Sequence, residues 1–343
     1  MTRTSSGRLG PMDVAPRQRV ARSFRSVALG GVALAVVLGA VVASLYFRYI
    51  HYERVAARHV PPGSIFAARI DVEQVDLYEP VRRHLVPLLG GPSRSAPEAA
   101  ATLSRLEERT GLKRGDLREI VAARGAKRPE WAVILGGIFP RGTSPAVLAA
   151  ALAAEDPAWA PSLDGTVVVH RGTGVAVTRA ADGAVIIAAQ YAIAVAAREP
   201  GNAYALLGLP ETGAGAVAMR EAGVRELGAW PGLLADQTLA RSFAGVGAFR
   251  ADVGLGERPS VTVTLADVEP GSASATVHRA VELAKALDPS EATPGSLLLR
   301  AGAQRSSFAP PTSGSASVKL VWDRSEVDQA FQLLADAIQD HWR

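Results

Sequence analysis

The sequence predicts an α+β fold, with an N-terminal transmembrane helix followed by a duplicated strand-helix-hairpin-helix-strand unit that has mainly antiparallel sheets. Three observations support this prediction. A long uncharged apolar segment lies near the N-terminus, short alternating apolar runs bounded by turn residues follow it, and amphipathic helical stretches lie between those runs. A similar order of elements returns after residue 200, which indicates the duplication.

Residues 27–47 form the predicted transmembrane helix. These 21 residues carry no charge, and at about 1.5 Å per residue they span about 31 Å, which matches a hydrocarbon core of about 30 Å. Tyr46, Tyr49 and Tyr52 lie where an interfacial aromatic belt is expected. The alternative is a signal peptide cleaved after Ala43, although the apolar run exceeds the ~7–15 residues typical of such peptides.

The charges beside the span predict its orientation. The tail at residues 1–26 contains one acid, Asp13, and six arginines, which are Arg3, Arg8, Arg17, Arg19, Arg22 and Arg25. The positive-inside tendency places this tail in the cytoplasm and the C-terminal domain outside. The difference in positive charge between the two sides of the span is weakened by three arginines that follow it, Arg48, Arg54 and Arg58. The chain contains 33 Arg and only 4 Lys, and this preference for residues with GC-rich codons indicates a bacterium with a GC-rich genome. We therefore expect the span to lie in the inner (cytoplasmic) membrane of a bacterium.

One face of the predicted span contains only small residues. Gly31, Ala35, Gly39 and Ala43 recur every four residues, and such a face lets two helices approach closely. A homodimer through the span is therefore one interpretation. The other is that the spacing follows simply from a chain rich in Ala and Gly.

The rest of the chain divides into segments by composition and periodicity. The predicted segments are a stalk at 48–62, a first α+β half at 63–200, a linker at 201–212 and a second half at 213–343, with a mobile loop rich in Pro, Ser and Gly at 288–313. Ser144 is a good N-cap for a helix that starts at Pro145. In the second half, a predicted helix at 272–287 places Val277, Val281 and Ala284 on one face.

The charge distribution argues against a nucleic-acid partner. The net charge of the chain is +4, but seven arginines and one aspartate lie in residues 1–50, which leaves 30 basic and 32 acidic residues in 51–343. The basicity is therefore a signal of membrane topology and not a phosphate-binding surface. The absence of cysteine excludes disulfides and cysteine-ligated metal sites.

No motif names a reaction. The six histidines lack metal-ligand spacing, and the sequence contains no HExxH motif, no GxSxG elbow and no P-loop. We therefore assign no catalytic, cofactor-binding or metal-binding residue. Asp71 and Glu73, next to Asp76, would share a face of a strand. They could form an acidic hydrolase site, or they could simply mark an exposed strand end.

Three segments, "VPPGSIFAARIDVEQV", "RLEERTGLKRGDLREIV" and "EWAVILGGIFP", resemble a loose group of uncharacterised bacterial envelope proteins. These combine an N-terminal anchor with a large α+β domain, and the similarity covers most of residues 60–340. The resemblance implies the architecture and carries no activity. We therefore expect a non-catalytic binding or structural role in the cell envelope, with the lipid bilayer and an envelope protein as partners. The alternative is a membrane-anchored hydrolase with an acidic site near Asp71.

Overall fold

A computed structural model describes residues 53–84, 96–127, 129–140, 142–228, 237–288, 293–310, 312 and 314–342. The predicted tail, the span at 27–47 and its face of Gly31, Ala35, Gly39 and Ala43 lie outside the described residues. Among the residues that are described, no helix is both long enough and apolar enough to cross a membrane. Residues from Glu53 onward form one compact unit.

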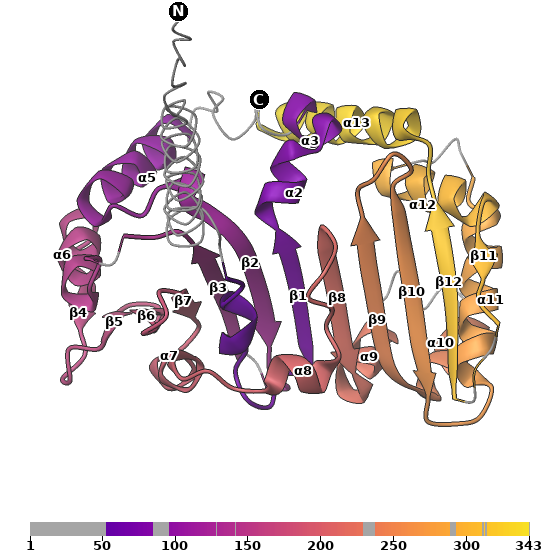
Figure 1. The fold of residues 1–343 in the computed structure, drawn as a ribbon, viewed down its shortest axis with the longest axis horizontal. Helices are drawn as coiled ribbons and strands as arrows, with labels where there is room; N and C mark the ends of the chain where they lie inside the picture. The colour runs from indigo at the N-terminus through magenta and orange to yellow at the C-terminus, as the bar shows by residue number, and fades with distance from the viewer. Residues whose placement is uncertain are drawn as a thin grey trace, which may run out of the picture. The chain divides into compact units, whose positions relative to one another are not determined.

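This unit is built on a single antiparallel sheet (Figure 1), which confirms the α+β prediction. The strand order is β11-β12-β10-β9-β8-β1-β2-β3-β7-β6-β5-β4. The strands are β1 (Phe66–Asp71), β2 (Leu117–Arg124), β3 (Trp131–Gly137), β4 (Trp159–Pro161), β5 (Val167–His170), β6 (Ala176–Arg179), β7 (Val185–Ala188), β8 (Gly215–Arg220), β9 (Val246–Gly254), β10 (Ser260–Asp267), β11 (Ser307–Phe308) and β12 (Ser315–Val321).

Helices connect these strands and cover parts of the sheet. The described residues include two short 3-10 helices, η2 (Ala56–His59) and η3 (Arg114–Asp116). The α-helices are α2 (Val72–Leu77), α3 (Glu79–His84), α5 (Ala96–Thr110), α6 (Pro145–Glu155), α7 (Tyr191–Arg198), α8 (Ala203–Leu207), α9 (Glu221–Gly228), α10 (Gln237–Ala244), α11 (Ser272–Lys285), α12 (Pro294–Gln304) and α13 (Arg324–Trp342).

The two halves have a partly similar order of elements and meet at the centre of the sheet. In each half a first strand is followed by helices and a hairpin, but α6 is then followed by β4, β5, β6 and β7 in the first half, whereas α11 and α12 are followed by β11 and β12 in the second. From the centre outward, the strands run β1-β2-β3-β7 in one direction and β8-β9-β10-β12 in the other. The first strands of the halves, β1 and β8, pair with each other in antiparallel register. The predicted halves therefore belong to one continuous sheet.

The halves differ in how they bury that sheet. In the first half, neighbouring residues Val185 and Ile186 point to opposite faces, and both are buried, so both faces of β7 are covered. In the second half, Leu265 packs beneath the helices, whereas Thr264 faces the other way and shares a hydrogen bond of 2.7 Å with Ser317. At β10 and β12 the sheet therefore has one apolar face and one polar face.

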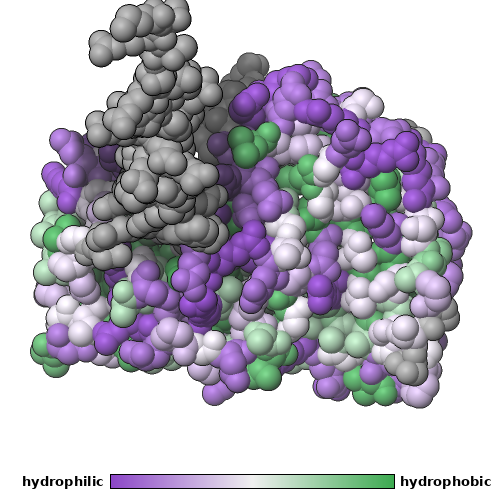
Figure 2. All heavy atoms as spheres, viewed as in Figure 1, coloured by the Kyte–Doolittle hydropathy of each residue, from purple (hydrophilic) through white to green (hydrophobic). Residues whose placement is uncertain are grey.

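Helices from both halves also meet at one end of the sheet, where α3 packs on α13. His84 lies 3.0 Å and Arg83 3.3 Å from the Asp328 carboxylate, and Arg324 pairs with Glu79. Figure 2 shows mostly hydrophilic residues gathered over α3 and α13. These ion pairs connect the two halves a second time, in addition to the sheet.

Two predicted connecting segments belong to the folded unit. Residues 48–62 were expected to form a stalk, of which 48–52 lie outside the described residues. In the described part, η2 packs on β2 and β3, and His59 and Val60 are buried. The predicted linker at 201–212 contains α8, where Tyr204 and Leu207 are buried. The apolar side chains of these segments therefore contribute to the core of the unit.

Within the predicted mobile loop at 288–313, where only residues 296–300 were expected to be ordered, the structure contains α12 and β11. Thr293 caps α12 by accepting the Ser296 N–H at 3.2 Å, and Pro294 occupies the first turn. Helix α12 is also fixed from the sheet side. The Trp322 indole donates to the Leu298 carbonyl at 2.5 Å, and a Cβ placed on Gly302 would lie 2.6 Å from the Trp322 ring.

We expect Gly302→Ala to lower the free energy of unfolding by about 1–3 kcal/mol, because the added methyl group overpacks the contact with Trp322. Gly295→Ala is the matched control, since a Cβ there meets nothing closer than 4.0 Å. The control should be neutral or stabilising by up to about 1 kcal/mol. Urea unfolding of the full chain, followed by tryptophan fluorescence, measures both. Equal effects of the two substitutions would contradict the packing described.

Candidate functional site

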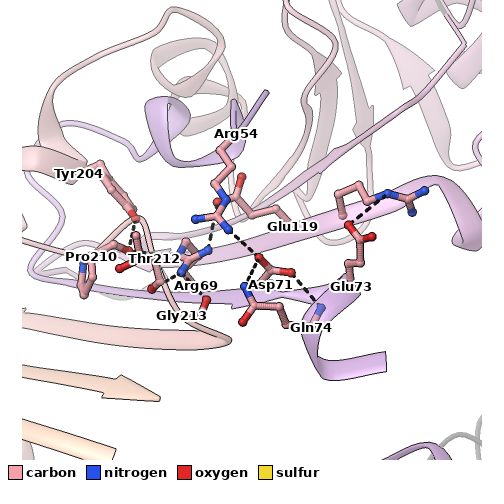
Figure 3. A network of polar contacts seen from close by, with 11 residues as sticks. Arg54, Arg69, Asp71, Glu73, Gln74, Glu119, Tyr204, Pro210, Thr212 and Gly213 are labelled. Carbon is pink, nitrogen blue, oxygen red and sulfur yellow. Dashed lines mark hydrogen bonds and ion pairs between the residues drawn. The ribbon is translucent and has the colours of Figure 1, made fainter. Parts of the chain in front are cut away.

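A buried cation lies at the centre of the sheet, where the halves meet (Figure 3). Arg69 on β1 is 1 % exposed. Its Nε donates to the Pro210 carbonyl at 3.1 Å, and its Nη2 donates to the carbonyls of Thr212 and Gly213 at 2.7 and 2.8 Å. The guanidinium therefore binds the backbone of the segment that leads into β8.

Glu119 on β2 supplies the neighbouring negative charge. Its Oε1 lies 4.0 Å from Arg69 Nη1, and its side chain is 2 % exposed. At this distance the attraction is an ion pair and not a hydrogen bond. Tyr204 donates to the Pro210 carbonyl at 2.6 Å, and burial raises the pKa of the Tyr204 hydroxyl to about 12. We call Arg69, Glu119, Tyr204, Pro210, Thr212 and Gly213 the seam network.

Asp71 and Glu73 do not form the predicted acidic cluster. Strand β1 ends at Asp71, and α2 begins at Val72, so Asp71 and Glu73 do not share a strand face. Asp71 is the N-cap: it accepts the Gln74 N–H at 3.0 Å and the Gln74 side-chain amide at 3.1 Å. It also forms an ion pair with Arg54 at 2.7 Å. Glu73 is exposed, with Arg118 4.0 Å away (Figure 3).

The described histidines are engaged in separate places. His170 binds Asp156 at 3.0 Å, His84 binds Asp328, and His278 stacks on Phe308 with ring centroids 4.1 Å apart. No group of three or more His, Cys, Asp or Glu side chains that could hold a metal ion occurs within the part of the chain that the structure describes.

His59 is the most buried of these histidines, with no exposed surface. Its Nδ1 lies 2.6 Å from the Ala197 carbonyl, and its Nε2 lies 2.9 Å from the Asp182 carboxylate. Both partners are acceptors, so the ring donates from both nitrogens in its protonated form. Burial lowers the pKa of His59, but the bonds to Asp182 and Ala197 outweigh it and raise the pKa above 6.5.

The second half contains an apolar cavity of about 170 Å³. It lies between the sheet and helices α10, α11 and α12. Its lining residues are Phe243, Phe249, Val263, Leu265, Thr276, Val277, Ala280, Val281, Ala284, Leu299, Ala303, Val318 and Leu320. The single hydroxyl among them, on Thr276, donates to the Ser272 carbonyl at 2.7 Å. The cavity therefore offers no polar group to a ligand.

Unfilled apolar space costs stability, because the lining side chains lack packing partners on that side. Only the face of Val277, Val281 and Ala284 was predicted from the sequence. Two alanines leave the space open, Ala280 and Ala303. Their place beside a cavity could not be predicted, because nothing in the sequence shows which residues oppose them.

No family model matches the chain, and no curated protein matches it. Three crystal forms of a protein named TP0453 are similar in structure. Form I has a TM-score of 0.41 and 11 % identity, and covers 86 % of this chain and 100 % of TP0453. Form III has 0.44 and 10 %, covering 83 % and 98 %, and form IV has 0.43 and 9 %, covering 84 % and 97 %. At TM-scores below 0.5 these likenesses establish neither a shared fold nor a function.

We expect Arg69→Met to lower the free energy of unfolding by about 3–5 kcal/mol, as breaking a buried ion pair does. The substitution removes three hydrogen bonds to backbone carbonyls and the cation beside Glu119. Arg225→Met, which breaks an exposed pair with Glu221, is the control and should change stability by less than about 0.5 kcal/mol. Urea denaturation of both variants measures the difference. A loss below about 1 kcal/mol in Arg69→Met would contradict a structural role for the seam network.

We expect the His59–Asp182 pair to make stability fall as pH rises. A histidine whose pKa is raised in the folded state stabilises fully below its unfolded pKa of about 6.5, and this contribution is lost as pH passes the folded pKa. His59→Gln should flatten the decrease above pH 6.5, whereas His278→Gln should leave it unchanged. Urea midpoints measured between pH 5.5 and 9 test this, and an equal slope in His59→Gln and the unaltered chain would rule the pair out as its source.

Proposed function

We propose that this chain is a single-pass membrane-anchored protein of the bacterial envelope, with a non-catalytic binding role for its extracytoplasmic domain. Residues 27–47 would anchor it in the inner membrane, with residues 1–26 in the cytoplasm. The uncharged apolar segment and the arginine-rich tail support this topology. The face of Gly31, Ala35, Gly39 and Ala43 would allow a homodimer through the span, and an envelope protein would be the partner of the domain.

The observation that carries the non-catalytic role is the engagement of Asp71. A general base needs a carboxylate that can reach a substrate proton. Asp71 instead accepts two hydrogen bonds from Gln74 and pairs with Arg54, and its side chain is 11 % exposed. This arrangement makes Asp71 a helix cap and argues against the alternative of an acidic hydrolase site.

The seam network supports the same conclusion. Arg69 is committed to three backbone carbonyls, and Glu119 lies beside it with 2 % of its side chain exposed. Charged groups held in this way connect strands and are closed to a substrate. Among the described residues, the apolar cavity of the second half offers space for an apolar ligand.

We expect a C-terminal epitope tag to be degraded by protease in intact spheroplasts, because the positive-inside tendency places the domain outside. A cytoplasmic marker protein in the same sample is the control and should be degraded only after lysis. Gel sizing of the membrane fraction separates an uncleaved anchor from a product that lacks residues 1–43. Protection of the tag until lysis would overturn the proposed topology.

A further inference from the structure

We propose that the apolar cavity of the second half binds the end of a single alkyl or acyl chain. The cavity has about 170 Å³ of space. An engineered protein cavity of about 150 Å³, lined by Leu, Ile and Phe, stays dry and binds benzene. This space therefore suits an apolar group of about six carbons.

The lining decides the chemistry of the occupant. Every lining side chain except Thr276 is apolar, and the Thr276 hydroxyl is already bonded to the Ser272 carbonyl. A ligand group that needs a hydrogen bond would be buried there without a partner, which is unfavourable. Water is disfavoured for the same reason, because a buried water needs two to four polar partners. A saturated hydrocarbon chain meets no such penalty.

One lining residue shows where a chain could enter. Leu299 on α12 lines the cavity and is 45 % exposed, so the cavity reaches the surface beside it. A chain that enters there keeps its polar end in water while its apolar end is buried. The sheet and α12 bound the cavity, and both are held in place. Strand β10 pairs with both β9 and β12, and the Leu298 carbonyl of α12 accepts a hydrogen bond from Trp322.

The choice of an acyl chain rests on the proposed function, since a membrane-anchored domain lies beside a bilayer that contains such chains. Two sources share this chemistry, a free fatty acid and the acyl chain of a phospholipid. The labelling experiment below does not depend on which side of the membrane the domain occupies. A failure of the topology test and a failure of this inference are therefore distinguishable.

The test uses the full chain in phosphatidylcholine nanodiscs and two photoreactive probes. One is a fatty acid with a diazirine near the end of its chain, and the other is a phosphatidylcholine whose acyl chain carries the same group. After irradiation, mass spectrometry maps the labelled peptides. We expect labelling of α11, α12 or β12 by at least one probe. Labelling by the fatty acid identifies a free acid as a ligand, and labelling by phosphatidylcholine alone identifies a lipid-borne chain.

Two substitutions on one helix provide the matched comparison. Ala284→Leu fills the cavity and should reduce labelling of these peptides at least tenfold, while Ala275→Leu, on the exposed face of α11, should leave it unchanged. The filled variant should unfold at an equal or higher urea concentration, because it removes a void. Ala280→Leu serves in its place if Ala284→Leu does not fold. Absence of labelling with both probes, or equal labelling in the filled and control variants, would overturn the inference.

Discussion

The pairing of β1 with β8 is the interaction on which the rest of the structure depends. The hydrogen bonds from Asp71 N–H to the Ala214 carbonyl and from Arg220 N–H to the Ile65 carbonyl, each 2.9 Å long, lie at the two ends of this pairing. Without it, each half would present an unpaired edge strand to solvent. Arg69 fixes its register, because a shift by one residue would move the guanidinium to the opposite face and away from the carbonyls it binds.

The two halves of the continuous sheet are packed differently. In the first half both faces of β7 are covered, and His59 is buried where η2 packs on β2 and β3. In the second half, β10 buries one face, and the helices above that face leave the apolar cavity open. Gly302 and Trp322 hold α12 close at one point of its length. The alanines at 280, 284 and 303 provide the space elsewhere along the same interface.

The sequence predicted the α+β class and many strands because alternation and turn residues are local signals. The helix at Pro145 was predicted through Ser144, and its N-cap is confirmed at 3.3 Å from the Val147 N–H. The same signal, Thr293 before Pro294, preceded α12, but the Pro, Ser and Gly content of that segment favoured a loop. Asp71 is likewise a residue type favoured at N-caps, but it was interpreted as sharing a strand face with Glu73.

The seam network could not be predicted, because its contacts join Arg69 to residues more than 140 positions away. A lone arginine in an apolar strand gives no indication of its partners.

Hydrogen exchange at the seam tests most directly the claim that the two halves form one body through β1 and β8. The full chain in nanodiscs would be exchanged into deuterated buffer, and the amides of Asp71 and Arg220 would be compared with those of the β2–β3 and β9–β10 hairpins. We expect the seam amides to exchange as slowly as the hairpins on both sides. Seam amides that exchange much faster than both hairpins would show that the halves open independently, and would contradict this account.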